Sequence, residues 1–142
     1  MAEIGLHALS LCTVQGRLFE MAWSRGYDMK EFISGFMTSV TAASLDESFN
    51  RLQFCGEEYL FEEFITESDI KRTSRRRSAR HDAFFWIGYL YRYWHFYTGE
   101  TSVKMFRIAD YDLMTLVYAG YHTLSCEMAI DWLRERRRKT AA

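Results

Sequence analysis

The chain has 142 residues, of which 49% are hydrophobic and 26% charged, and its formal net charge is −1. This balance is typical of one folded globular domain and excludes a disordered polyelectrolyte. Proline is absent, so no segment contains an obligate helix breaker. We therefore predict a single all-α domain over residues 1–142, a bundle of about seven to eight helices around a central aromatic-rich helix.

The first helix is indicated by apolar residues that recur at spacings of three and four. It is expected to end near Gly26. Asp28 stands three residues before Glu31, the spacing of a capping box, and predicts the start of a second helix. The apolar positions are Leu11, Val14, Leu18, Met21 and Ala22 in the first helix and Phe32, Phe36 and Val40 in the second.

Two further helices are expected before residue 67. Ser44 with Glu47 repeats the capping spacing and predicts a short helix with Leu45, Phe49 and Leu52 on one face. After Gly56, the run EEYLFEEFI predicts a fourth helix whose early glutamates suit the positive end of the helix dipole. Its expected buried residues are Leu60, Phe61, Phe64 and Ile65.

Residues 67–81 interrupt this pattern, because they are rich in arginine, serine and threonine and contain one isolated isoleucine. This composition predicts a basic, solvated linker between an acidic half, 1–66, and a second half, 82–142. The acidic half has ten acids and four bases, a net charge of −6. From residue 67 onward there are nine acids and fourteen bases, a net charge of +5, so the chain is strongly dipolar.

The second half begins with the predicted central helix, for which Asp82 is the expected cap and Gly99 the expected end. Apolar residues occur on every side of it, which is typical of a buried helix; they are Phe84, Phe85, Trp86, Ile87, Leu90 and Trp94. Three more helices are expected to follow. Their expected caps are Thr101, either Asp110 or Asp112, and Ser125, and the last helix has Met128 and Trp132 one turn apart before the basic run RERRRK.

The segment YRYWHFYTGE, residues 91–100, supplies the main candidate site. Two interpretations stay open: the pocket of a small enzyme or anionic-ligand-binding protein, in which the arginine binds a phosphate or carboxylate, or a core in which the polar groups pair with one another. We favour the core, with Glu58 as the preferred partner of Arg92. The candidate ligand-binding residues are Glu58, Tyr89, Arg92, Tyr93, His95 and His122.

No signature of catalysis, of a metal or of a cofactor is present. The glutamate pairs of residues 57–63 lack the Glu-x-x-His tetrapeptide of helical carboxylate metal sites. Cys12, Cys55 and Cys126 have no CxxC spacing and are expected to be free thiols. We therefore predict no catalytic residues, no metal and no cofactor, and lean toward a protein that is not an enzyme.

Nucleic acid is an alternative partner, because eleven of the eighteen bases fall in residues 71–80 and 134–139. Against this stand a pI of about 6.4 and aromatic residues at core spacing. The candidate contacts are Arg75, Arg76, Arg77, Arg80, Arg136, Arg137 and Arg138. The N-terminal residues carry no basic signal-peptide region and no apolar run is long enough for a membrane span, so we expect a cytoplasmic protein without a membrane partner.

Three motifs give the chain a likeness to a known group: GEEY at 56–59, GYLYRYWHFYTGE at 88–100 and GYHTLSCEMAI at 120–130. With these motifs the chain resembles a family of small, uncharacterised bacterial all-helical proteins, over most of its length except the arginine-rich linker. The resemblance implies an association with toxin–antitoxin modules and an antitoxin-like or accessory role. Together with the charge asymmetry, it leads us to expect an interaction module that binds a protein partner.

Overall fold

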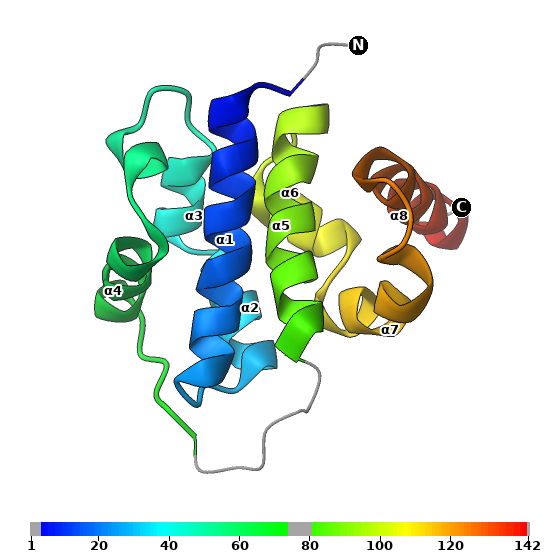
Figure 1. Ribbon diagram of the computed structural model, residues 1–142. Helices are drawn as coiled ribbons and strands as arrows, with labels where there is room; N and C mark the ends of the chain where they lie inside the picture. The colour runs from blue at the N-terminus through cyan, green and yellow to red at the C-terminus, as the bar shows by residue number, and fades with distance from the viewer. Residues whose placement is uncertain (1–3, 74–80, 142) are drawn as a thin grey trace.

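Two long helices, α1 (Leu6–Ser24) and α5 (His81–Thr98), lie side by side and antiparallel at the centre of the molecule (Figure 1). The computed structural model describes residues 4–73 and 81–141. These residues contain eight α-helices and no strand, which confirms the predicted all-α bundle. None of the described helices is both long enough and apolar enough to cross a membrane.

The other helices surround this central pair (Figure 1). Helix α4 lies on the side of α1, α7 and α8 lie on the side of α5, and α2, α3 and α6 pack behind. The bounds are α2 (Met29–Met37), α3 (Val40–Leu45), the 3-10 helix η1 (Arg51–Phe54), α4 (Glu57–Glu67), α6 (Ser102–Ile108), α7 (Tyr111–Tyr121) and α8 (Cys126–Ala141).

Glycines allow the close approach of α1 and α5. A Cβ added at Gly88 would lie 2.5 Å from the carbonyl oxygen of Gln15, and one added at Gly16 would lie 2.9 Å from the ring and carbonyl of Phe85. Both contacts involve backbone that cannot move aside without separating the helices. The two backbones therefore meet at Gly16 and Gly88, and α5 is fixed as the central helix.

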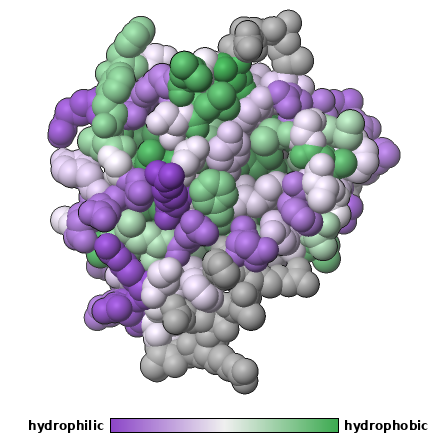
Figure 2. All heavy atoms as spheres, in the orientation of Figure 1, coloured by the Kyte–Doolittle hydropathy of each residue, from purple (hydrophilic) through white to green (hydrophobic). Residues whose placement is uncertain are grey.

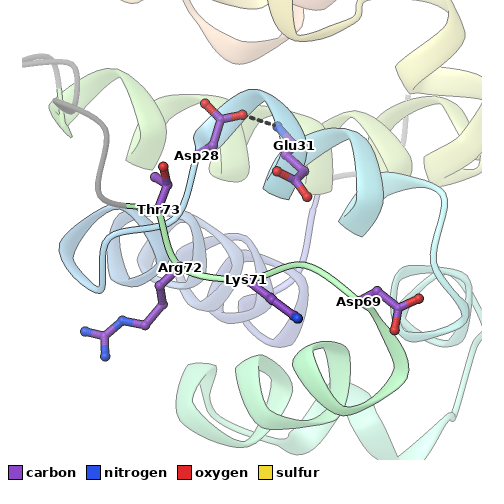
Figure 3. Close-up of a pocket in the computed structure, with 6 residues that line it drawn as sticks. All are labelled: Asp28, Glu31, Asp69, Lys71, Arg72 and Thr73. Atoms are coloured by element: carbon purple, nitrogen blue, oxygen red, sulfur yellow. Dashed lines mark hydrogen bonds between the residues drawn. The ribbon is translucent and has the colours of Figure 1, made fainter.

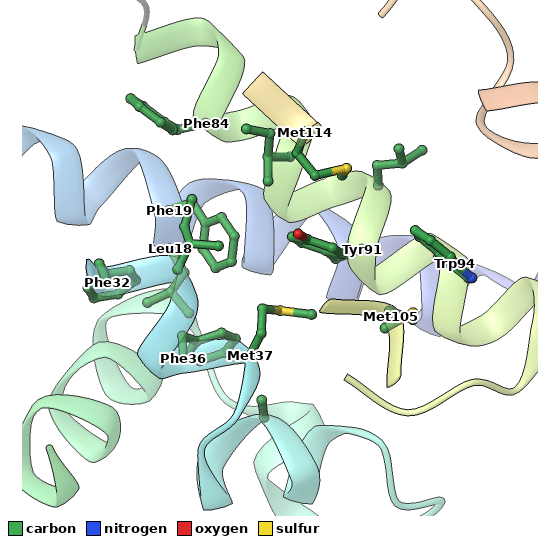
Figure 4. Close-up of a cluster of buried hydrophobic side chains, with 14 of the residues drawn as sticks. Leu18, Phe19, Phe32, Phe36, Met37, Phe84, Tyr91, Trp94, Met105 and Met114 are labelled. Carbon is green, nitrogen blue, oxygen red and sulfur yellow. The ribbon is translucent and has the colours of Figure 1, made fainter. Parts of the chain in front are cut away.

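The hydrophobic core is rich in aromatic rings and draws on both halves of the chain (Figure 4). Phe32, Phe36 and Phe64 meet edge to face or in parallel, with centroids 5.1 to 6.3 Å apart. From α5, Tyr91 and Trp94 are fully buried, and the Tyr91 hydroxyl donates to the carbonyl of Ala109. This confirms a single bundle around an aromatic-rich helix.

Most of the expected helix boundaries are confirmed. Asp28, Thr101, Asp110 and Ser125 each accept a hydrogen bond from a backbone N–H in the first turn of the following helix, at 3.0 to 3.3 Å. Gly26 and Gly99 follow α1 and α5 with φ of +91° and +79°, a conformation that L residues seldom adopt. Asp82 is different: it lies inside the first turn of α5 and accepts a hydrogen bond from the Tyr118 hydroxyl.

The prediction for residues 39–54 is wrong in three respects. Ser39, not Ser44, caps α3 by accepting from the N–H of Ala42, so Val40 starts a new helix and is exposed. The short helix expected from Ser44 does not form, because Ser44 lies within α3. Phe49 has a φ of +66° and is exposed rather than buried. Only Ser44 has the capping-box spacing to a glutamate, whereas the helix that forms is capped by Ser39, which is followed three residues later by Ala42.

Two expected apolar faces also need correction. In α8 the core contacts come from Ala129, Ile130 and Leu133, whereas Met128 and Trp132 remain about half exposed. In α4, Leu60, Phe61 and Phe64 are buried as predicted, and Ile65 is only partly buried.

The linker is shorter than expected and partly packed. Helix α4 includes Glu67 and α5 begins at His81, which leaves residues 68–80, of which 74–80 lie outside the described part. Ile70 packs on the core beside Gly35. Arg72 forms an isolated bridge with Tyr27 and donates from Nε to the carbonyl of Arg25 at 2.6 Å. These contacts hold the start of the linker against the end of α1.

Candidate functional site

Arg92 is the centre of the candidate cluster, and its side chain is 0% exposed. Each guanidinium nitrogen donates to a different protein acceptor. Nε donates to Gln15 Oε1 at 2.8 Å, one terminal nitrogen to Asp46 Oδ1 at 2.7 Å and the other to Ser102 Oγ at 3.2 Å. The arginine therefore has protein partners on all sides, supplied by α1, by the end of α3 and by the start of α6.

Asp46 is the ionic partner of Arg92, so the predicted pair with Glu58 is wrong. Asp46 is the C-cap residue of α3, and it also accepts from the backbone N–H and the hydroxyl of Ser102, each at 2.8 Å. Charged hydrogen bonds of this kind compensate the cost of burying both ions. The network thus ties α3, α5 and α6 together.

His95 lies one turn after Arg92 at the edge of the same network. Its Nδ1 is 2.7 Å from the carbonyl oxygen of Glu100 and 3.7 Å from Asp46 Oδ1. Burial lowers the pKa of His95, and the nearby Arg92 charge acts in the same direction, while the Glu100 carbonyl and Asp46 oppose it. The neutral imidazole is therefore favoured in the folded protein.

The cluster is closed to ligands. Among the described residues, no buried side-chain nitrogen or oxygen lacks a hydrogen-bond partner. Burial lowers the pKa of Arg92, and Asp46 counteracts this effect. A ligand that used the guanidinium would have to displace Asp46, Gln15 and Ser102 from inside the core. The arrangement can orient helices, and each nitrogen of its guanidinium already has a protein acceptor.

The six predicted ligand residues do not form one site. Glu58 is exposed on α4, and His122 is exposed at the end of α7, where Nδ1 lies 2.8 Å from the Tyr118 carbonyl. Tyr89 and Tyr93 stack on each other with centroids 6.3 Å apart, and the Tyr93 hydroxyl donates to Glu127. Only Arg92 and His95 share a polar neighbour.

The thiols are not arranged for nucleophilic chemistry. Burial raises the pKa of Cys12 to about 12 and that of Cys126 to about 11, so both stay protonated at neutral pH. Cys55 is half-buried, and its thiol faces the carbonyl of Arg51 at 3.7 Å. Within residues 4–73 and 81–141 there is no group of three or more His, Cys, Asp or Glu side chains placed to hold a metal ion.

A hollow of about 320 Å³ lies between the start of α2 and the described part of the linker (Figure 3). Asp28 and Glu31 lie on one side of it, and the segment from Asp69 to Thr73 lies on the other. Asp28 is already the cap of α2, and the Arg72 side chain points away from both carboxylates. Carboxylates and cations line this hollow together, so it has no preference for one ligand charge.

A second hollow, of about 370 Å³, lies between α7 and α8 and combines aromatic and basic side chains. Its lining residues are Tyr121, Trp132, Glu135, Arg136 and Lys139. The rings of Tyr121 and Trp132 meet edge to face, with centroids 5.6 Å apart. The sequence analysis assigned Trp132 to the packing of the last helix and did not include it among the candidate ligand-binding residues.

Three exposed apolar residues form the third surface feature, which we call the apolar patch: Leu6 and, in the segment between α3 and α4, Phe49 and Phe54, which are 87%, 95% and 73% exposed. Phe54 in η1 stacks on His7 of α1, with centroids 4.7 Å apart, so the segment after α3 lies against the N-terminal end of α1. Figure 2 shows hydrophobic side chains gathered over this end of the molecule. The segment between α3 and α4 thus presents two phenyl rings to solvent.

Four of the predicted nucleic-acid contacts, Arg75, Arg76, Arg77 and Arg80, lie outside the described residues. Arg136, Arg137 and Arg138 are exposed on the last turns of α8. Of these three, Arg138 pairs with Glu135 at 3.5 Å.

Comparison of the chain with models of known protein families, with curated proteins and with solved structures finds no match.

Proposed function

We propose that the chain is a non-enzymatic interaction module that binds a protein partner through the apolar patch of Leu6, Phe49 and Phe54. The observation that carries this proposal is Phe49, a phenylalanine that is 95% exposed with a φ of +66°. The left-handed conformation costs an L residue roughly 1 to 2 kcal/mol. The fold therefore holds a large ring in water on an unfavourable backbone.

Local geometry supports a functional reason for this exposure. Asn50 caps η1 by accepting from the N–H of Leu52 at 2.9 Å, and its own N–H donates to the carbonyl of Glu47 at 3.3 Å. These bonds fix the turn in which Phe49 projects outward. Strained backbone and exposed apolar patches concentrate at recognition sites, and buried aromatic anchors supply much of the binding energy at interfaces.

Acidic residues precede and follow the patch in the sequence, with Arg51 as the one base of η1, and they indicate the chemistry of the partner. Glu47 is exposed two residues before Phe49, and Glu57 and Glu58 begin α4 just after η1. Glu62 continues the acidic face of α4, where its contact with Arg25 is a surface pair at 3.8 Å. The partner segment that fits this surface carries an apolar anchor flanked by lysine or arginine, because opposite charges accelerate encounter and fix orientation.

The closed Arg92 network supports the non-enzymatic part of the proposal, since the most polar cluster of the core is occupied by the protein's own groups. The resemblance to helical proteins associated with toxin–antitoxin modules adds an antitoxin-like or accessory role. A cytoplasmic setting is part of the same proposal.

The test is comparative affinity purification of the native-expression protein at low salt. Phe49→Asp places a charge at the centre of the patch and should abolish capture of the partner. Leu116→Asp makes the same change at another exposed apolar residue, on α7, and should preserve capture. Glu58→Lys and Glu62→Lys together should weaken capture and reduce its dependence on salt.

Two results would reject the proposal. One is that no protein distinguishes the wild type and Leu116→Asp from Phe49→Asp. The other is that Phe49→Asp retains the partner with unchanged affinity in a direct titration of the purified pair.

A further inference from the structure

The hollow between α7 and α8 combines a flat ring with cations. Trp132 is 49% exposed, and its ring plane makes an angle of 80° with that of Tyr121. The two rings do not stack on each other, so Tyr121 buttresses the indole while about half of Trp132 stays in solvent. Trp94, in comparison, is fully buried in the core. Trp132 is therefore a platform on which another flat group can stack.

Two of the five bases of α8 are paired with acids of the protein, and the cations beside this platform are not among them. Arg134 contacts Glu100 at 3.1 Å, and Arg138 contacts Glu135 at 3.5 Å. Arg136 and Lys139 both line the hollow, and no acidic side chain of the described residues lies within ion-pair distance of either. They follow Trp132 by four and seven residues, which places all three on one face of the helix. Glu135, which also lines the hollow, is partly neutralised by Arg138.

We propose that this hollow binds single-stranded nucleic acid, with a base stacked on Trp132 and the adjoining phosphates paired with Arg136 and Lys139. Stacking on exposed aromatic rings combined with basic contacts to the backbone is the general mode of single-strand binding. A rise of about 1.5 Å per residue separates Trp132 from Arg136 by about 6 Å along the axis, a distance suited to one nucleotide. The volume of about 370 Å³ lies in the range of small-molecule sites and accommodates a nucleotide.

The site is independent of the apolar patch. Helix α8 lies on the α5 side of the bundle, and the segment between α3 and α4 lies on the α1 side (Figure 1). One molecule can therefore hold a protein partner and a nucleic acid at the same time.

The experiment is fluorescence anisotropy of the full chain with a labelled oligothymidylate of about twelve nucleotides, at about 50 and 200 mM salt. Trp132→Ala should weaken binding by about tenfold, and Trp132→Phe should retain most of the affinity, because the ring is kept. Arg136→Ala combined with Lys139→Ala should also weaken binding. It should reduce the slope of log affinity against log salt by about 1.4, which is about 0.7 for each lost phosphate contact.

Two matched controls separate this site from unspecific attraction. Arg137→Ala removes the same charge from a different face of α8 and should change the affinity by less than about twofold, if Arg136 acts through the site. An abasic oligonucleotide of equal length should bind the wild type about as weakly as oligothymidylate binds Trp132→Ala. Circular dichroism checks the fold of each variant. If Trp132→Ala unfolds, the abasic oligonucleotide and the Arg136 and Arg137 variants still test the proposed site.

The proposal is overturned if Arg137→Ala costs as much affinity as Arg136→Ala, if the abasic strand binds as tightly as oligothymidylate, or if no binding occurs at low salt. Phe49→Asp should leave the affinity for the oligonucleotide unchanged. Failure of the protein-partner proposal is thereby distinguishable from failure of this one.

Discussion

Arg92 on α5 and Arg136 on α8 are both arginines beside aromatic rings, and they occupy opposite environments. All three nitrogens of Arg92 donate to the side chains of Gln15, Asp46 and Ser102 inside the core. Arg136 lines an open hollow next to the half-exposed Trp132. The same combination of residue types thus produces a closed structural junction in one place and an accessible surface in the other.

This difference shows that the hydrogen-bond acceptors around the arginine, rather than the aromatic rings, determine whether such a cluster is closed or accessible to a ligand. At Arg92 a carboxylate, an amide and a hydroxyl arrive from three other segments of the chain. At Arg136 the described residues supply no carboxylate within ion-pair distance. A desolvated arginine needs such partners to remain charged, whereas an exposed one keeps its capacity for an external anion.

The largest expected effect tests this comparison directly. Arg92→Ala leaves Asp46 nearly buried without its ionic partner, and we expect it to lower the free energy of unfolding by about 3 to 5 kcal/mol. Arg136→Ala should leave the free energy of unfolding nearly unchanged. Urea denaturation followed by circular dichroism measures both. A cost of Arg92→Ala below about 1 kcal/mol would mean that the network is not a structural junction.

A double-mutant cycle sharpens the comparison at the level of one pair. Arg92→Met, Asp46→Asn and the double variant should give a coupling of about 1 to 3 kcal/mol, because the two ions meet at 2.7 Å away from solvent. The matched surface pair is Lys30 and Asp112, at 3.1 Å. The corresponding cycle of Lys30→Met and Asp112→Asn should give a much smaller coupling, since both groups are exposed. Equal coupling energies for the two pairs would contradict the expectation that the buried pair is the stronger one.

Sequence reasoning predicted the local features of the fold well, since they depend on residues close in the chain. Periodicity identified α1, α4 and α5, and short-range spacing identified the caps Asp28, Thr101 and Ser125. It also favoured a satisfied core around Arg92 over an open pocket. It failed between residues 39 and 54, because the capping-box spacing marks Ser44 and Glu47, whereas the helix that forms is capped by Ser39, which has no glutamate three residues later.

The partner of Arg92 could not be predicted in this way. Asp46 stands 46 residues before Arg92 and carries no motif, and the five glutamates of α4 were equally suitable by charge. Only the path of the chain after α3 brings Asp46 to the arginine. Likewise, α8 buries Leu133 and leaves Trp132 outside, a rotation of one residue that the amphipathic pattern of a mostly basic helix does not specify.

His95 and His122 allow a third comparison of a buried with an exposed side chain, through the pH dependence of the free energy of unfolding, and its expected effect is smaller. Unfolded His95 takes up a proton at its ordinary pKa of 6.5, and burial lowers this pKa in the folded state. Between the two values the unfolded chain binds more protons, so the free energy of unfolding should fall as pH drops below about 6.5. His95→Gln should lose this part of the pH dependence, while His122→Gln, at an exposed position, should keep it. Urea titrations from pH 7.5 to 5 measure the difference, and equal profiles for the wild type and His95→Gln would contradict it.

The smallest expected effect is that of Phe49→Gly on the free energy of unfolding, and the sign of this change is more informative than its size. Glycine tolerates a φ of +66° without strain, a relief of roughly 1 to 2 kcal/mol, and adds about 0.5 to 1 kcal/mol of backbone entropy to the unfolded chain. Phe49→Gly should therefore raise the free energy of unfolding by about 0.5 kcal/mol and abolish partner capture. Phe54→Gly, in the ordinary backbone of η1, should lower it. If Phe49→Gly destabilises the protein as Phe54→Gly does, the exposed ring carries no stored strain, and the argument that the fold gives up stability to display it no longer holds.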